Sequence, residues 1–262
     1  MGRIRGNAVM KAGRIMEMER YILSKGAATM EELQQFFGVS MNTIRRDVAE
    51  LIEKGTVSKV YGGVCVRQGN SPLTPYDIRL GADLEAKMSI GRRAASLVQD
   101  GDVIFLDSGT TTLRMVDYLS EVKELTVITN NLEAILHAFP YENIRVVALP
   151  GELRRKTNSF TGVDAVRYLK RYNIRTAFLA ATGVSLSGAT NSSSLEYEIK
   201  QAAVENSGRS VLLIQHGKFG VTGLMTYAPL SDFDTIVTNA LPPQAYVDHC
   251  REQGIRLMVA DQ

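Results

Sequence analysis

Six consecutive residues, Asp107-Ser108-Gly109-Thr110-Thr111-Thr112, are the best candidates in this chain for binding a charged small molecule. The apolar residues at 103–106 predict a buried strand before them, and those at 113, 115, 116 and 119 predict a helix after them. Such a turn leaves backbone N–H groups free at the positive end of the helix dipole, which attracts a phosphate or a carboxylate. The same residues also suit an ordinary capped turn, in which Ser108 or Thr110 only satisfies the helix end.

Further polar residues follow other expected strands. Because open α/β sheets bind ligands beyond the carboxyl ends of their strands, we expect these residues to border one cleft. Amide, hydroxyl and cationic groups in that cleft suit a phosphorylated polyhydroxy compound. Arg154 and Lys218 also suit plain surface positions, where such side chains are usually found. The polar runs are Thr129-Asn130-Asn131, Gly151-Glu152-Leu153-Arg154, Thr182-Gly183, Gly188-Ala189-Thr190-Asn191 and Gln215-His216-Gly217-Lys218.

A second set of functional candidates lies near the N-terminus. Ser40 is placed to cap a helix whose first two turns carry Asn42, Thr43, Arg45 and Arg46. Arg46 lies about 200° round that helix from the apolar residue 44, at 100° per residue, so it faces away from the core. Side chains at these positions reach base edges and phosphates when the helix lies in the major groove of DNA. The alternative is the solvated face of a small helical bundle.

Three helices and a hairpin position this second set. Apolar residues at 15, 18 and 22 mark a first helix that ends near Lys25-Gly26. Thr29 and Glu32 form a capping box for a second helix, and the third runs from Ser40 to Gly55. The Gly38-Val39-Ser40 turn between them predicts a helix-turn-helix. Residues 57–66 predict two strands around Gly62-Gly63, the wing of a winged helix, on which Lys59 is placed to contact a DNA phosphate.

The rest of the chain alternates short β-rich runs with helical runs. This alternation predicts a C-terminal α/β domain with three layers and a largely parallel sheet. After a helix over 85–99 and the strand at 103–106, we expect strands at 125–129, 144–149, 176–182, 210–215, 235–238 and 256–260. The helices between them are expected at 131–138, 163–172, 194–206 and 243–253.

The predicted organisation is a winged helix-turn-helix domain at 11–67, a linker at 68–82 and an α/β domain at 83–262. Pro72 and Pro75, with glycine and serine, give the linker its composition. The first ten residues are basic and lack the apolar run of a signal peptide, so we expect a disordered lead-in.

Charge and cysteine content narrow the class of protein. Residues 1–70 hold eleven basic and seven acidic side chains, while the whole chain carries a net charge of +2. A basic first quarter on a mildly acidic body suggests a module that meets a polyanion. The two cysteines form no spaced pair, the three histidines do not cluster, and no apolar run reaches membrane-spanning length. We therefore expect a soluble cytoplasmic protein with no disulfide, no metal and no cofactor.

With these residues identified, the chain resembles the DeoR family of bacterial transcriptional regulators. The first half carries Val39-Ser40 through Thr43-Ile44-Arg45-Arg46-Asp47, then Leu51, Gly55 and Tyr61-Gly62-Gly63. The second half carries 102–112, Thr129-Asn130-Asn131, Gly188-Ala189-Thr190, Glu198 with Lys200, and Lys218-Phe219-Gly220.

The resemblance implies a repressor whose sensor domain binds a phosphorylated sugar on a fold similar to ribose-5-phosphate isomerase. It implies ligand-binding roles for residues 107–112, Asn130, Asn131, Gly151, Thr182, Gly183, Glu198, Lys200 and Lys218. Two positions depart from the family pattern. The family usually has an acidic residue and a serine around the late lysine, where this chain has Gln215-His216-Gly217-Lys218, and Pro150-Gly151 stands for a Gly-Gly pair. These departures bear on which sugar phosphate is bound.

The expected partners are double-stranded operator DNA, a phosphorylated sugar effector and a second or further copy of the chain, in a homodimer or homotetramer. Helix-turn-helix proteins usually read paired half-sites, which requires two DNA-reading heads. The alternative function is a sugar-phosphate isomerase that uses the same pocket, with Glu196 or Glu198 as the base and Lys218 stabilising the enediolate. An isomerase has no need of a helix-turn-helix, which favours the regulator.

Overall fold

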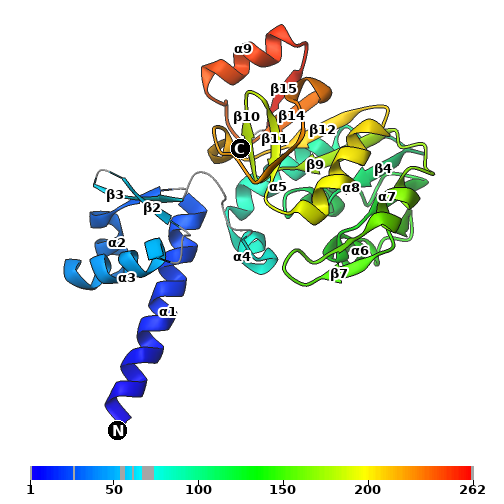
Figure 1. The fold of residues 1–262 in the computed structure, drawn as a ribbon. Helices are drawn as coiled ribbons and strands as arrows, with labels where there is room; N and C mark the ends of the chain where they lie inside the picture. The colour runs from blue at the N-terminus through cyan, green and yellow to red at the C-terminus, as the bar shows by residue number, and fades with distance from the viewer. Residues whose placement is uncertain (1, 26, 54–56, 61, 67–73, 261–262) are drawn as a thin grey trace. The chain divides into compact units, whose positions relative to one another are not determined.

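The computed structural model describes residues 2–25, 27–53, 57–60, 62–66 and 74–260 (Figure 1). The chain divides into two compact units, Met1–Pro72 and Leu73–Gln262. Each unit has a hydrophobic core of its own.

The first unit contains the predicted helix-turn-helix. Its elements are α1 (Gly2–Lys25), β1 (Ala27–Thr29), α2 (Met30–Phe37), α3 (Met41–Glu53), β2 (Val57–Val60) and β3 (Gly63–Val66). The capping box forms as predicted: Thr29 N donates to Glu32 Oε2 at 2.8 Å, and Glu32 N donates to Thr29 Oγ1 at 3.1 Å. Gly38 ends α2 in the left-handed conformation, with φ 61°. Buried apolar side chains from all three helices make the core.

The wing is a three-stranded antiparallel sheet in the order β1-β3-β2. The hairpin of β2 and β3 was predicted, but β1 was not, because three residues are too short to show a strand period. A Cβ atom at Gly63 would overlap the carbonyl oxygen of Ala28, so the glycine permits the close approach of β1 and β3. The predicted helix end at Gly55 and residue 61 of the wing turn lie outside the described residues.

The first ten residues were expected to be disordered, and this is wrong in the structure, where α1 begins at Gly2. The expectation relied on the basic character of these residues and on their lack of an apolar run. A helix that is already nucleated extends at little cost, one hydrogen bond for each residue added, without needing further apolar contacts.

The second unit is built on a seven-stranded sheet in the order β15-β14-β12-β9-β4-β5-β6, with every neighbouring pair parallel. This confirms the predicted α/β domain with a parallel sheet. The strands are β4 (Val103–Leu106), β5 (Leu125–Thr129), β6 (Ile144–Ala148), β9 (Thr176–Ala180), β12 (Ser210–Leu213), β14 (Thr235–Thr238) and β15 (Arg256–Val259).

Helices cover both faces of this sheet and make three layers. Phe105 packs into one core and its neighbours Ile104 and Leu106 into the other, because successive side chains of a strand point to opposite faces. One core includes side chains of α7 (Val163–Leu169), α8 (Ser194–Glu205) and α9 (Gln244–Glu252). The other includes α4 (Tyr76–Gly81), α5 (Leu84–Ala95), the 3-10 helix η1 (Thr112–Tyr118) and α6 (Leu132–Ala138).

Several short elements of the second unit were not predicted from the sequence. The strands β7 (Glu152–Arg154) and β8 (Ser159–Thr161) form a hairpin. The strands β10 (Gly183–Ser185), β11 (Gly188–Asn191) and β13 (Met225–Ala228) form a small antiparallel sheet. Two short 3-10 helices, η2 (His216–Lys218) and η3 (Leu230–Asp232), complete the unit.

The linker predicted at 68–82 differs from the structure at its C-terminal end. Residues 76–81 form α4, and Tyr76 is 2% exposed within the core of the second unit. Residues 68–73 of the predicted linker lie outside the described residues. The proline and glycine composition that suggested a linker ends at Pro75, which is the N-cap residue of α4. Among the described residues, no helix is both long and apolar enough to cross a membrane.

Candidate functional site

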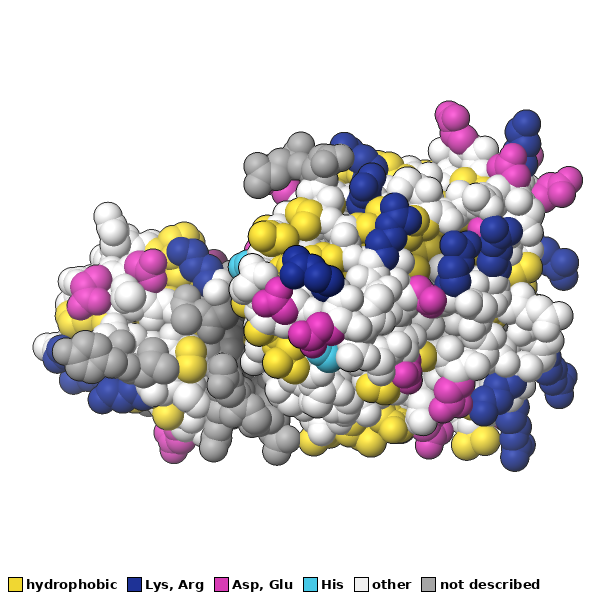
Figure 2. Space-filling model, turned by 90° about the horizontal axis from the view of Figure 1, so that it is seen from above, with side chains coloured by type: hydrophobic (Ala, Val, Ile, Leu, Met, Phe, Trp, Pro, Cys, Tyr) yellow, Lys and Arg dark blue, Asp and Glu magenta, His cyan; other side chains and the backbone are white. Residues whose placement is uncertain are grey.

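The exposed surface of α3 carries the residues predicted to read DNA. Asn42, Arg45 and Arg46 are exposed there, on the side opposite the buried Ile44. Ser40 caps the helix as predicted: Thr43 N donates to Ser40 Oγ at 3.3 Å, and the hydroxyls of Ser40 and Thr43 lie 2.9 Å apart. Lysine and arginine side chains gather at one edge of this unit (Figure 2).

An ion pair fixes the orientation of α3. Asp47 is 1% exposed and accepts hydrogen bonds from Arg14 of α1, from Nε at 2.6 Å and from Nη2 at 3.3 Å. One turn away, Lys11 Nζ lies 2.7 Å from Glu50 on the surface. A buried carboxylate held by a bidentate arginine is a geometrically specific contact, so Arg14 and Asp47 define how α3 sits on α1. Lys59 is exposed on β2, in the wing.

The second unit has one topological switch point in its parallel sheet, between β4 and β9. From β4 the strand order runs outward through β5 and β6, and from β9 it runs the other way through β12, β14 and β15. Connections therefore leave on opposite sides, and in open α/β sheets the ligand-binding crevice lies beyond the carboxyl ends of the two strands at such a point, here β4 and β9. Residues 107–112 follow β4, and Ala181 and Thr182 follow β9, so the structure brings both sets to this crevice.

Asp107 at the end of β4 organises the crevice floor. Its Oδ1 accepts hydrogen bonds from Gly109 N at 2.6 Å and from Thr112 Oγ1 at 2.9 Å. Its Oδ2 accepts from Ala180 N at 2.9 Å and from Lys200 Nζ of α8. Lys200 also donates to the carbonyl of Ala180 at 2.9 Å. Both oxygens of Asp107 are thus engaged inside the protein, which holds the loop 107–112 against β9.

The loop 107–112 presents unused hydrogen-bond donors. No hydrogen bond joins the backbone N–H groups of Ser108, Thr110, Thr111 and Thr112 to an acceptor among the described residues, whereas Gly109 N is taken by Asp107. Ser108 Oγ donates to Glu196 Oε1, which also accepts from Ser159 Oγ at 2.9 Å. Buried N–H groups are normally paired, so this loop is suited to an acceptor that comes from outside the chain.

Gly109 does not have a positive φ, so backbone freedom is not what requires a glycine in this loop. A Cβ atom there would lie 2.6 Å from Ala180 Cβ and 2.8 Å from Asp107 Oδ1. The absence of a side chain is therefore what allows the loop to approach β9.

Two asparagines after β5 line the same edge. Asn131 Oδ1 caps α6, accepting from Glu133 N at 3.1 Å, and its Nδ2 donates to the carbonyls of Asp107 and Gly109, each at 3.4 Å. Asn130 Nδ2 donates to Phe160 O at 3.2 Å. Both asparagines are at most 1% exposed, so the loop 107–112 rests on a buried amide.

The remaining residues predicted to border the crevice follow the carboxyl ends of β6, β9 and β12. Thr182 Oγ1 accepts from Ser192 N at 3.1 Å, and a Cβ atom at Gly183 would overlap the carbonyl oxygen of Val221. Gly151 precedes β7 with φ 146° and lies against Thr161. Lys218 in η2 is half-buried and donates to the carbonyl of Ala181 at 3.3 Å, which places it at the end of β9. Burial, with the nearby cations Arg79 and Lys87, lowers the pKa of Lys218 to about 7.

The structure does not bring Glu198 to this cluster. Glu198 is exposed on α8, whereas Glu196 and Lys200 of the same helix are 4% exposed and face the crevice floor. Residues four apart share a helix face and residues two apart do not. From the sequence, Glu196 was predicted only as a possible catalytic base. Its contacts with Ser108 and Ser159 were not predicted. The i, i+4 spacing of Glu196 and Lys200 was the signal that both side chains share one face of the helix.

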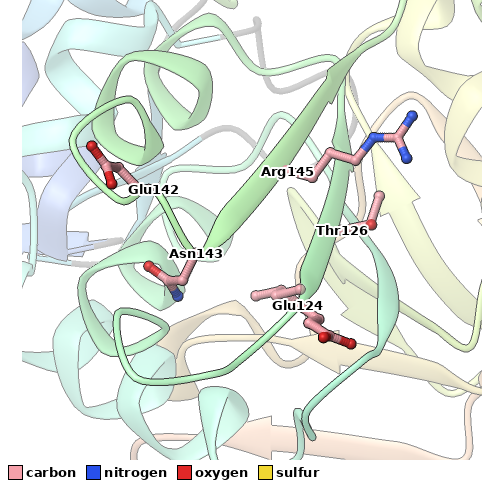
Figure 3. A pocket seen from close by; sticks show the side chains of 6 residues that line it. Glu124, Thr126, Glu142, Asn143 and Arg145 are labelled. Atoms are coloured by element: carbon pink, nitrogen blue, oxygen red, sulfur yellow. The ribbon is translucent and has the colours of Figure 1, made fainter.

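A separate hollow lies at the opposite edge of the sheet, where β5 and β6 begin (Figure 3). Glu124, Thr126, Glu142, Asn143 and Arg145 line it. Asn143 is held by the carbonyls of Leu119 and Val122 at 3.1 and 2.8 Å. Because ligands of open parallel sheets bind at the carboxyl ends, the crevice and not this hollow is the candidate site. Among the described residues, no group of three or more histidine, cysteine or acidic side chains is placed to hold a metal ion.

Comparisons with known proteins give a family match for each of the two units. Residues 14–68 match the DeoR-like helix-turn-helix domain, and residues 82–240 match the DeoR C-terminal sensor domain. The HTH-type transcriptional regulator IolR of Bacillus subtilis strain 168 is 42% identical over 252 residues, which cover 96% of this chain and 100% of that protein. The glycerol-3-phosphate regulon repressor of Escherichia coli K12 is 29% identical, covering 90% of this chain and 94% of that protein. Among solved structures, ribose 5-phosphate isomerase A of Methanocaldococcus jannaschii aligns with a TM-score of 0.38 and 21% identity, over 52% of this chain and 55% of that one.

Both relatives are named as transcriptional regulators, and this chain matches each of them over nearly its full length. The chain is therefore a regulator and not an isomerase, the alternative function. Because one model of this family matches the helix-turn-helix and another matches most of the second unit, the chain belongs to the DeoR family of helix-turn-helix transcriptional regulators.

Proposed function

We propose that this regulator represses a carbohydrate-utilisation operon and releases its operator when a phosphorylated sugar or polyol binds in the crevice of the second unit. The observation that carries the effector class is the loop 107–112, whose four unused backbone N–H groups lie at the end of β4. Several N–H groups that converge at a strand-to-helix turn suit the oxygens of a phosphate. The name of one relative, the glycerol-3-phosphate regulon repressor, points to the same chemical class.

The groups around this loop suit the rest of such an effector. Lys218 supplies a cation beside the end of β9. The sugar hydroxyls meet amide groups, a side-chain hydroxyl and backbone groups, which are supplied by Asn130, Asn131, Thr182, Gly183 and Gly151. A charged phosphate and several hydroxyls require this mixture, whereas an apolar ligand does not. In this assignment the side chains of Asp107, Lys200 and Glu196 act indirectly, by holding the loop 107–112 in place.

On the DNA side, Arg45 and Arg46 read base edges from α3, with Ser40, Asn42 and Thr43 at the same helix start, and Lys59 contacts a phosphate from the wing. The exposure of both arginines and the rigid seat of α3 on Arg14 and Asp47 support this assignment. A homodimer or homotetramer supplies the second reading head that paired half-sites require. Such a regulator works in the cytoplasm, where bacterial operators are found.

The test combines two measurements on the full-length protein. Thermal unfolding is followed with glucose 6-phosphate, fructose 6-phosphate, ribose 5-phosphate and glycerol 3-phosphate, since a ligand that binds only the native state raises its stability. An operator duplex is selected from a random DNA pool, and its affinity is measured with and without each compound that binds. At least one compound is expected to bind and to weaken operator binding. If every compound that binds leaves operator affinity unchanged, the sensor proposal fails.

A further inference from the structure

The segment 76–83, which contains α4, bridges the crevice from one half of the sheet to the other. At its start, Tyr76 OH lies 3.5 Å from Asn131 Oδ1, and Tyr76 N donates to Lys156 O at 3.0 Å. At its end, Asp83 Oδ2 accepts from Gln215 Nε2 at 3.1 Å. Asn131 follows β5 and Gln215 follows β12, and β4 and β9 lie between these two strands.

The dimensions agree with a bridge. Four neighbouring strands span about 14 Å, at roughly 4.8 Å between strands. The six residues of α4 rise about 9 Å, and the side chains of Tyr76 and Asp83 reach beyond the helix to Asn131 and Gln215. We call residues 76–83 the strap.

The C-terminal end of the strap is held firmly. Lys87 is 2% exposed, and its ammonium group donates to the carbonyls of Arg79 and Ala82, where α4 ends. Asp83 keeps a left-handed backbone, with φ 48°, although it is not glycine. A residue other than glycine stays in this region only when its surroundings hold it there. These contacts fix the end of the strap at Asp83.

The Tyr76 end meets the effector loop through one side chain. Asn131 donates to the carbonyls of Asp107 and Gly109 at 3.4 Å and faces Tyr76 OH at 3.5 Å. All three contacts are made by the one Asn131 side chain, and each lies at the long end of hydrogen-bond distances. A small shift of loop 107–112 therefore alters all three contacts together. Burial raises the pKa of Tyr76 to about 12, so its hydroxyl keeps the proton that it donates.

We propose that Tyr76, through Asn131, is the positioning residue that passes a ligand-induced shift of loop 107–112 to the chain leading to the DNA-binding unit. The proposal rests on the effector site proposed above. Tyr76 is the first residue of α4 and follows Val66, the last residue of β3, by ten positions. The strap's helix lies between the two family matches, which end at 68 and begin again at 82, so neither domain assignment gives it a role.

The decisive variant is Tyr76→Phe, which removes the hydroxyl and keeps the ring. Tyr246→Phe is the matched control, because it removes another buried hydroxyl of the same unit, one that donates to Val184 O at 3.1 Å. For each full-length protein we would measure the affinity for the most strongly binding sugar phosphate of the panel by calorimetry, and the operator affinity with and without it. The ratio of the two operator affinities is the coupling factor. Thermal unfolding confirms that each variant is folded.

The expected result for Tyr76→Phe is near wild-type affinity for ligand alone and for operator alone, with a coupling factor reduced about 2–12-fold, the range that one neutral hydrogen bond contributes. Tyr246→Phe is expected to keep the wild-type factor. An unchanged factor in Tyr76→Phe overturns the proposal. So does a loss of ligand affinity, which would make Tyr76 part of the binding site itself.

A second variant, Asn131→Asp, tests the same path from its other partner. Its carboxylate keeps the acceptor for Tyr76 and the α6 cap but loses the donor to Asp107 O and Gly109 O. Reduced coupling in this variant is expected, and full coupling contradicts the path. Failure of the effector proposal is seen separately, because the wild-type protein itself would then show no coupling.

Discussion

The ammonium group of Lys200 and the carboxylate of Asp107 form a buried ion pair that joins α8 to the end of β4 across 93 positions of sequence. The two side chains are 5% and 1% exposed. Tyr227 closes the site on another side, with its ring 5.5 Å from the ammonium and its hydroxyl 3.2 Å from Ala180 O. The pair therefore sets the position of the loop 107–112, which the proposed effector contacts.

Removing the cation leaves Asp107 buried without its partner. We expect Lys200→Met to lower the free energy of unfolding by about 3–5 kcal/mol, as for other buried pairs that lose one member. Urea unfolding at neutral pH measures this change. Lys170→Met, at an exposed position after α7, is the matched control and should change the free energy by no more than about 0.5 kcal/mol. Equal effects of the two substitutions would show that the pair is not holding the loop.

Gly109→Ala tests the close approach of the loop to β9. The added Cβ would press on Ala180 and Asp107, so the loop must move away. We expect at least about a tenfold loss of sugar-phosphate affinity and a loss of about 1–3 kcal/mol in stability, as for other overpacked sites. Gly217→Ala is the control, because no atom lies within 4 Å of its added Cβ. Normal calorimetric affinity in a folded Gly109→Ala protein would move the site elsewhere.

Arg46→Ala tests the reading surface of α3. If Arg46 makes a bidentate contact with a base, the substitution should weaken operator binding by about 1–3 kcal/mol and relax specificity at one base pair. Gel-shift titration measures the change, with Arg167→Ala on α7 as the exposed-arginine control. An Arg45/Arg46 double alanine variant that stays folded and binds the operator with wild-type affinity would rule out α3 as the reading helix.

Lys59→Ala distinguishes a phosphate contact from a base contact. A lysine on the wing that neutralises one phosphate should weaken binding to operator and unrelated duplexes alike. The slope of log affinity against log salt should flatten by roughly one unit, since one fewer counterion is released. Titrations at several salt concentrations measure this slope. A change confined to the operator sequence would contradict the phosphate assignment.

The pKa of Lys218 predicts a pH dependence of effector binding. A lysine is charged below its pKa, so the attraction of Lys218 for an anion should fall as the pH rises through about 7. The effector phosphate also titrates, near pH 6, so the affinity of the wild-type protein is compared with that of Lys218→Arg, which stays charged. Between pH 6 and 8 the wild-type affinity should fall about tenfold relative to that of the variant. A constant ratio would place the charged end of the effector away from Lys218.

Local signals allowed much of the fold and part of the candidate site to be predicted from the sequence. The capping box of Thr29 and Glu32 involves residues three apart, and it forms as expected. The four apolar residues at 103–106 identified a central strand, and the polar turn after it indicated where a ligand would meet the sheet. These signals depend on the periods of helices and strands and on side chains that are close together in the sequence.

Only the tertiary structure decided how these pieces combine. The switch point between β4 and β9 depends on strand order, and the pairing of Asp107 with Lys200 joins residues far apart in the sequence. The burial of Glu196 and the exposure of Glu198 depend on which face of α8 packs on the sheet. Residues 76–82 of the strap were predicted as linker, because a six-residue helix has too few turns to show a period. The strap is held by contacts with Asn131 and Gln215. Such contacts follow from packing that minimises the exposed apolar surface of the whole unit, and no local pattern encodes them.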